Sequence, residues 1–211
     1  MTIPQLPPEA EQEYYKKISK IESNDNPKAK AKTSSASGRF QFIRATWEGL
    51  GYDWKDVFND KKQWEAIERF TKRNAAALVE AGCAVNHATL YGAHFLGVSG
   101  FLRVMRGDPS ASIATVTNEA QRRANPTILK GTIRDFTDWL KRKTGDDYTK
   151  RYTKSGWVSG PGVELPPEAP IVVEPGFGDK PTPEPQRRIS GLIVAMLILA
   201  GLAAILYFTT R

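Results

Sequence analysis

The chain reads IESNDNPKA at residues 21–29 and SASGRFQFI at residues 35–43, and these two stretches decide how the rest of the sequence is interpreted. The first stretch closes a segment whose apolar side chains recur every three or four residues, which predicts an amphipathic helix. Glu22 follows the last of them, so we expect its carboxyl group where this helix meets the core. The polar run at 24–27, which ends in Pro, stops the helix. The stripe itself consists of Tyr14, Ile18 and Ile21.

Further helices are expected downstream of these stretches. Apolar spacing predicts one helix at about 38–50, which carries Gln41, and a longer one at about 61–81. Two shorter helical pieces are expected near 101–105 and within 110–124. The fold class predicted from these elements is all-α, because we find no alternating strand pattern of useful length before residue 155.

Several residues predict where these helices begin and end. Gly82 is placed to end the helix at 61–81, and Asn86 is placed to cap the next one. Thr132 with Asp135 has the spacing of a capping box, so a last helix should begin there. Gly145 should end that helix.

Charge and composition divide the chain into three parts. The chain has 211 residues and a formal net charge of +7, and residues 1–155 hold 26 Lys and Arg against 18 Asp and Glu. A basic domain is attracted to polyanions, of which nucleic acid and the bacterial cell wall are both examples. The sequence lacks the ordered basic and aromatic pattern of nucleic-acid modules, so no nucleic-acid partner is predicted.

The sequence has a single cysteine and two histidines, which predict no metal site and no cofactor.

The C-terminal part predicts a spacer followed by a membrane anchor. Residues 151–186 are rich in Pro and Gly and should form an extended linker. Residues 187–211 contain an uncharged run at 189–208, and a helix of that length spans roughly 30 Å, the thickness of a bilayer core. A single-pass membrane protein that contacts the lipid bilayer is therefore expected. More arginine lies before the run than after it, which favours a cytoplasmic domain in an ordinary cell.

The two opening stretches together resemble the active-site half of the lysozyme-like lytic transglycosylases, which cut bacterial peptidoglycan. That family shows Glu-Ser, an Asn-Pro-x-Ala stretch, Ala-x-Gly-Leu-x-Gln and a nearby Thr-Trp. Here Arg39 replaces the Leu. A later segment, AHFLG at residues 93–97, and the stretch ANPTI at 124–128 resemble phage-like members. The resemblance implies a lysozyme-like helical domain at residues 1–150, with peptidoglycan glycan strands as its partner.

The resemblance also implies which residues do the chemistry. Glu22 would be the single catalytic acid, first protonating the glycosidic oxygen and then taking a proton from the 6-hydroxyl of N-acetylmuramic acid, which leaves a 1,6-anhydro end. An apolar pocket raises a carboxyl pKa, as this step requires. Asp25 could instead assist a true hydrolase as a second carboxylate, or it could be a solvated turn former. The residues expected to bind substrate are Ser23, Gly38, Phe40, Gln41, Tyr91, His94 and Phe95.

Some of these assignments have structural alternatives. Gly38 would allow close approach either of a sugar or of a neighbouring helix. His94 would be either a residue of the cleft or a satisfied core histidine, and Phe95 stands where the commoner family form has a substrate-binding Asn. Phe136 or Trp139 is expected to take the place of a family Tyr near the last helix.

Three functions remain open from the sequence. The first is a membrane-anchored lytic transglycosylase, expected in a bacteriophage as a virion protein or lysis enzyme acting on the periplasmic wall from the virion or the host inner membrane. The second is a true lysozyme-like hydrolase. The third is an inactive wall-binding or structural virion membrane protein, which could contact other virion membrane proteins.

Overall fold

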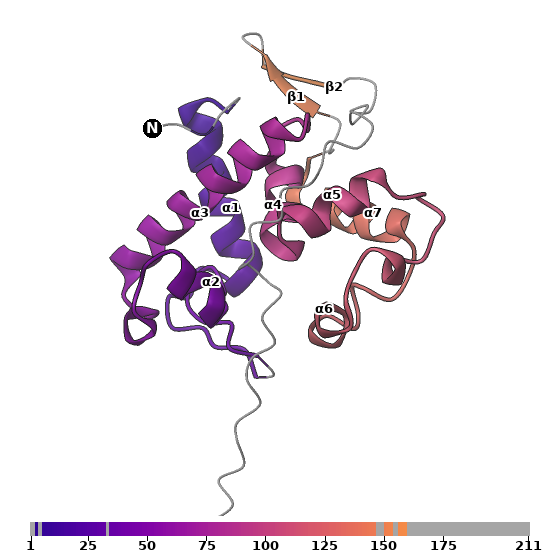
Figure 1. Ribbon diagram of the computed structural model, residues 1–211. Helices are drawn as coiled ribbons and strands as arrows, with labels where there is room; N and C mark the ends of the chain where they lie inside the picture. Colours follow the sequence, from indigo (N-terminus) through magenta and orange to yellow (C-terminus); the bar gives the residue numbers. More distant parts are fainter. Residues whose placement is uncertain (1–2, 4–5, 33, 147–149, 154–155, 160–211) are drawn as a thin grey trace, which may run out of the picture. The chain divides into compact units, whose positions relative to one another are not determined.

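The computed structural model describes residues 3, 6–32, 34–146, 150–153 and 156–159, all within one compact unit that spans Met1–Asp179. These residues are mostly helical, as the sequence predicts (Figure 1). Most of the linker at 151–186 and the whole predicted span at 189–208 lie outside the described residues. Within the described part of the chain, no helix is both long enough and apolar enough to cross a membrane.

Helix α1 (Pro8–Ser23) forms and ends as its sequence predicts. Proline fits the first turn, where a backbone N–H would have no helical partner, and Glu9 and Glu11 suit the positive end of the helix. The helix ends because Asn24 adopts a left-handed conformation with φ of 55°. Tyr14 and Ile18 are 1% and 0% exposed, and Ile21, the last residue of the predicted stripe, is partly buried.

The predicted helix at 38–50 is wrong in its first half. Helix α2 spans only Arg44–Gly49, and residues 38–41 form a turn. Gly38 and Gln41 have φ of +80° and +49°, which an α-helix cannot contain. Ser37 makes isolated β-bridges to Lys30 and to Phe42, so this segment folds back on the loop that follows α1.

The other predicted helices are present with their expected caps. Helix α3 spans Asp60–Glu80 and α4 spans His87–Leu96, which Asn86 opens with a complete capping box. Helix α7 spans Ile133–Thr144; Thr132 and Asp135 form its capping box, and Gly145 ends it with φ of 69°. Between α4 and α7 lie α5 (Val98–Arg106), the 3₁₀ turn η2 (Ile113–Thr115) and α6 (Glu119–Ala124), while η1 (Trp54–Asp56) precedes α3.

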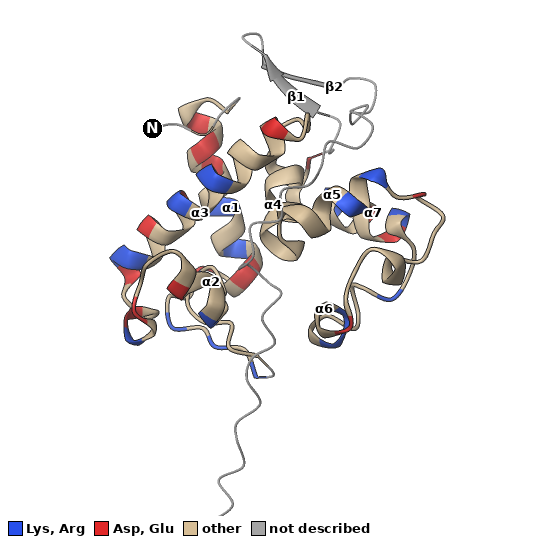
Figure 2. Ribbon diagram, in the orientation of Figure 1, with Lys and Arg blue, Asp and Glu red and all other residues tan. Residues whose placement is uncertain are grey.

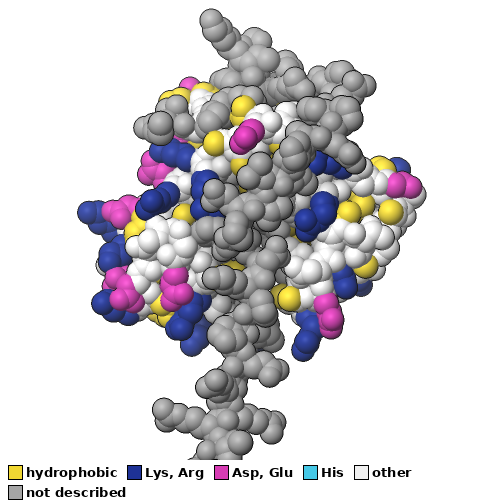
Figure 3. All heavy atoms as spheres, viewed as in Figure 1, with side chains coloured by type: hydrophobic (Ala, Val, Ile, Leu, Met, Phe, Trp, Pro, Cys, Tyr) yellow, Lys and Arg dark blue, Asp and Glu magenta, His cyan; other side chains and the backbone are white. Residues whose placement is uncertain are grey.

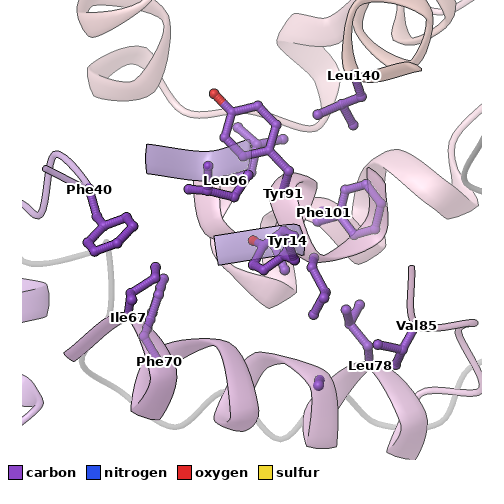
Figure 4. Packing of buried hydrophobic residues seen from close by; sticks show 14 of the residues in the cluster. Tyr14, Phe40, Ile67, Phe70, Leu78, Val85, Tyr91, Leu96, Phe101 and Leu140 are labelled. Atoms are coloured by element: carbon purple, nitrogen blue, oxygen red, sulfur yellow. The ribbon is translucent and has the colours of Figure 1, made fainter. Parts of the chain in front are cut away.

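Helix α4 packs against α3, α5 and α7. It carries no Lys, Arg, Asp or Glu along His87–Leu96, as its uniform tan colour in Figure 2 shows. Gly92 allows α5 to approach closely, because a Cβ atom there would lie 2.3 Å from the Phe101 ring. In Figure 4, Tyr14, Tyr91 and Phe101 occupy the middle of the buried cluster, with α3 side chains along one edge and Leu140 of α7 at the opposite edge. This packing makes α4 the element on which α3, α5 and α7 are assembled.

A short antiparallel hairpin follows the helices. Strands β1 (Lys150–Thr153) and β2 (Gly156–Ser159) pair with Lys150 opposite Ser159. Strand β1 begins before residue 155, where no strand was predicted, because four residues are too few to show an alternating pattern. The hairpin lies where the linker was expected to begin.

The described surface mixes charges of both signs. In the face shown in Figure 3, basic and acidic side chains are interspersed and hydrophobic side chains appear as small separate spots. Such mixing keeps a protein soluble without creating a strong field of one sign. The excess of positive charge is therefore not gathered into one patch among the coloured side chains visible in Figure 3.

Candidate functional site

Glu22 lies in the last turn of α1, and its side chain is 16% exposed. Burial raises the pKa of this carboxyl group to about 7, against opposing effects from a hydrogen bond with Tyr91 and from the positive charge of Lys143. A carboxyl group with a pKa near neutrality can hold its proton and also lose it under physiological conditions. The remaining exposure leaves the group open to a molecule from solution.

Two side chains from α4 face this carboxyl group. Tyr91 donates its hydroxyl hydrogen bond to Glu22, and burial together with the negative charge of Glu22 raises the pKa of Tyr91 above its ordinary value. His94 lies one turn along the same helix face, with Nε2 3.7 Å from Oε1 of Glu22. Helix α4, which has no Lys, Arg, Asp or Glu, thus supplies both the Tyr91 hydroxyl and the His94 imidazole that face Glu22.

Half-buried aromatic rings continue from this point toward α7. The Tyr91 ring centroid lies 5.7 Å from that of Trp139, and Phe95 lies 5.0 Å from Trp139. Phe95 and Trp139 are only partly buried, whereas Phe136 is completely buried beneath them. Of the two residues proposed for the place of the family Tyr, Trp139 is the one with an accessible ring.

Ser23 binds the neighbouring loop. Its hydroxyl donates to the backbone carbonyl of Arg39 at 2.7 Å and accepts from the backbone N–H of Asn26 at 3.0 Å. These bonds connect the end of α1 to both ends of the loop that follows it. The hydroxyl therefore positions the backbone around Glu22.

Gly38 approaches a neighbouring helix. A Cβ atom there would lie 2.7 Å from Oε1 of Gln63 on α3, so the space that a side chain would need is filled by protein. Gln41, two residues after Arg39, donates from Nε2 to the Gly38 carbonyl at 2.8 Å and closes its own turn. Phe40 is 0% exposed and packs edge-on against Trp64, which leaves no surface for a ligand.

Gln63 organises this loop and was not predicted. Its Oε1 accepts a hydrogen bond from the Arg39 backbone N–H, and its Nε2 donates to the Pro27 carbonyl at 3.0 Å. The side chain is completely buried. The available signal was its position on the apolar stripe of α3, one turn before Ile67, where a polar residue needs buried partners.

Arg39 also has a structural role. Its guanidinium forms ion pairs with Asp25 and Asp60 and lies 5.3 Å from the Trp64 ring. Hydrogen bonds from Ser19 and Arg39 lower the pKa of Asp25 below its ordinary value. Asp25 itself has φ of 67°, as expected for a turn residue. This carboxylate is a weak base that is already engaged with an arginine.

Two surface hollows lie elsewhere on the described residues. One, of about 360 Å³, is lined by Tyr52, Glu65, Glu68, Arg69 and Lys72. The other, of about 300 Å³, lies between α5 and the start of α7. Neither includes Glu22. Among the described residues there is no group of three or more His, Cys, Asp or Glu that could hold a metal ion.

Comparison with known proteins gives no further guidance. No protein-family model matches the chain, and no curated protein matches it. The geometry around Glu22 is therefore the main structural basis for a functional proposal.

Proposed function

We propose that this protein is a lytic transglycosylase that cleaves the β-1,4 bond between N-acetylmuramic acid and N-acetylglucosamine in peptidoglycan. The observation that carries the proposal is a single buried carboxyl group whose pKa is raised to about 7 and which still has 16% of its side chain exposed. Such a group can protonate a leaving glycosidic oxygen near neutral pH. The GRFQ turn and the Glu-Ser pair, in register with the family pattern, add support from the sequence.

In this mechanism the same carboxyl group acts twice. Glu22 gives its proton to the bridging oxygen as the C1–O bond breaks, and the electron pair of that bond goes to the leaving sugar. The resulting carboxylate then takes the proton of the 6-hydroxyl while that oxygen bonds to C1. The proton balance closes without water, so one acid is enough.

The hydrolase alternative needs a second carboxylate to activate water. Asp25 is the nearby acid in sequence, but its ion pair with Arg39 and its lowered pKa make it a poor base. This observation favours the one-carboxyl mechanism over the two-carboxyl mechanism. The partly exposed rings of Phe95 and Trp139, which lie next to Tyr91, offer flat apolar surfaces for stacking of sugar rings.

We also propose, from the sequence, that the enzyme is anchored to a bilayer by residues 189–208. Because the arginines favour a cytoplasmic domain and the wall lies outside the inner membrane, a bacteriophage origin resolves the conflict: the enzyme would act on the periplasmic wall from the virion or during lysis. Finding the protein only in infected-cell membranes, and in no purified virion, would exclude the virion role.

The direct test is digestion of purified peptidoglycan by the wild type and by Glu22→Gln. We expect clearing of a peptidoglycan gel by the wild type only, with products that are one water lighter than hydrolysed fragments. Products of full hydrolytic mass would indicate a lysozyme-like hydrolase. Wall binding without clearing by the wild type would support an inactive wall-binding protein.

A further inference from the structure

The loop between α1 and α2 contains a short run of alternating lysine and alanine, KAKAK at residues 28–32. The three lysines are exposed, whereas the two alanines are half-buried. This alternation is that of an extended chain, in which successive side chains point to opposite sides. Residues 26–47 hold five Lys and Arg and no Asp or Glu, so the positive charge of the loop is not balanced within it.

Backbone pairing holds this lysine run in place. The Gly38 N–H donates to the Ala29 carbonyl at 2.7 Å, and the Ala31 N–H donates to the Ala36 carbonyl at 2.9 Å. The run cannot turn its lysines toward the protein without breaking these bonds. The three ammonium groups therefore stay on the solvent side, on side chains that leave the backbone roughly 7 Å apart from one lysine to the next.

The lysine run lies close to Glu22. Ser23, which follows Glu22, donates its hydroxyl hydrogen bond to the Arg39 carbonyl at 2.7 Å. Arg39 is joined through Gly38 to Ala29, the alanine between the first two lysines. Two hydrogen bonds and one peptide unit thus separate Ser23 from Ala29, a path of roughly 15 Å.

The three lysines have charge available for a partner. Lys28 donates to the Phe58 carbonyl at 3.3 Å and lies 5.9 Å from the centroid of that ring. Within the part of the chain that the structure describes, no acidic side chain forms an ion pair with any lysine of the run. Asp56 and Asp60, on either side of Phe58, are paired with other basic residues.

We propose that Lys28, Lys30 and Lys32 bind the free carboxylates of the peptide that peptidoglycan carries on N-acetylmuramic acid. This inference rests on the proposed function and specifies its substrate as glycan that still carries its peptides. The sugars of such a strand are uncharged, whereas the peptide has several carboxylates along one chain. An extended peptide of four residues spans up to ~14 Å, so a peptide attached to a sugar at Glu22 reaches the lysine run.

Binding to the full chain with Glu22→Gln tests the proposal without cleavage. The probes are a tetrasaccharide of peptidoglycan that carries tetrapeptides and an uncharged tetramer of N-acetylglucosamine. Replacing all three lysines of the run with Gln should raise Kd for the peptide-bearing probe about tenfold at low salt, because each exposed ion pair contributes a small amount. Kd for the neutral probe should change less than about twofold. High salt should remove the difference between the variants, since exposed charges are screened.

The matched control replaces Lys16, Lys61 and Lys130 with Gln, which removes the same charge from exposed positions outside the loop. It should leave both Kd values within about twofold of the parent. Equal losses in the two triple variants, or equal losses for the two probes, would overturn the proposal. Unchanged binding in the loop variant would also overturn it, and would mean that the lysines only shield an exposed backbone edge from other chains.

Two further outcomes separate this inference from its rivals. Vesicles of phosphatidylglycerol provide the comparison with a membrane surface. If the loop lysines were needed for vesicle binding, while the peptide-bearing probe bound no better than the neutral one, the proposal would be wrong and the run would belong to a lipid-binding surface. If the wild type cleaves no peptidoglycan and binding still depends on the peptide and the loop lysines, the proposed function fails and the lysine run stands as a wall-binding surface.

Discussion

Arg39 and Asp60 are joined by two hydrogen bonds, from Nη2 at 2.8 Å and from Nε at 3.1 Å, which both end on Oδ1 of the aspartate. The arginine side chain is 10% exposed, whereas that of Asp60 is 53% exposed. The pair connects the start of α3 to the turn that follows Gly38. The Leu that the resembled family prefers at this position could not make this connection.

Replacing Arg39 with Leu should loosen that turn. Both aspartate partners of Arg39 are more than half exposed and would return to water, so the loss should be limited to about 1–2 kcal/mol of unfolding free energy. Urea unfolding measures this loss, and amide exchange should accelerate most in residues 25–41. Arg39→Lys keeps the positive charge but lacks the planar guanidinium group. Its unfolding free energy should therefore lie between those of the wild type and Arg39→Leu. A Leu variant as stable as the wild type would show that the ion pairs contribute nothing.

The stability cost of a side chain at Gly38 can be compared with its cost at Gly145, a second glycine with positive φ. The φ of +80° at Gly38 disfavours any side chain, and a Cβ would also meet the buried Gln63 amide at 2.7 Å. Gly38→Ala should therefore lower the unfolding free energy by about 2–4 kcal/mol, from backbone strain and lost loop bonds. Gly145→Ala is the matched control, because φ there is +69° with nothing within 4 Å, and it should cost only about 1 kcal/mol. Equal costs at both positions would show that contact with Gln63 is unimportant.

The helices could be predicted from the sequence because local signals determine them. The Asn86 and Thr132 caps and the left-handed Gly145 all act within one or two turns of the chain, and each is present. The turn at 38–41 could not be predicted, since it depends on Gln63, a residue more than twenty positions away. Apolar spacing alone favoured a helix there, and a tertiary contact prevented it.

The candidate site was predicted only in part, because it too depends on contacts between residues far apart in the sequence. Glu22, Tyr91 and His94 come together because the end of α1 lies against α4. The sequence placed Glu22 where its helix meets the core, and only the family resemblance connected it with Tyr91 and His94. Phe40 was expected to contact a sugar, yet it is completely buried. Gly38 was expected to lie against either a sugar or a neighbouring helix, and it lies against Gln63 of α3. Periodicity shows which residues line a helix face, but it does not show which of them remain exposed after packing.

Trp139 is predicted to bind substrate. Its ring is half-buried and lies 5.0 Å from that of Phe95 and 5.7 Å from that of Tyr91, which faces Glu22. Trp139→Ala should raise KM for peptidoglycan fragments about tenfold, while kcat changes less than KM, because stacking on a sugar is similar in the ground state and the transition state. Phe136→Leu, at a completely buried ring, is the control and should alter stability rather than KM. An unchanged KM for Trp139→Ala would remove this ring from the binding surface.

Glu22 is predicted to reduce the stability of the folded protein at neutral pH. Its pKa is about 7 when folded and 4.5 when the side chain is free. Between these values the folded state binds more protons than the unfolded state, so stability falls as pH rises from 4.5 to 7. Above pH 7 the full cost of ionising the buried carboxyl applies, which is about 3 kcal/mol for this difference in pKa. Glu22→Gln should therefore raise Tm at pH 8 and have little effect on Tm at pH 4.

Thermal unfolding at a series of pH values measures this effect directly. Glu80→Gln, on the exposed end of α3, makes the same chemical change in water and should shift Tm little at any pH above 5. The gain at position 22 should appear with a midpoint between pH 4.5 and 7 and should accompany the loss of glycan cleavage, because the burial that raises the pKa also costs stability. If Glu22→Gln and Glu80→Gln had the same Tm profile, the carboxyl group at position 22 would have an ordinary pKa, and it could not serve as the acid.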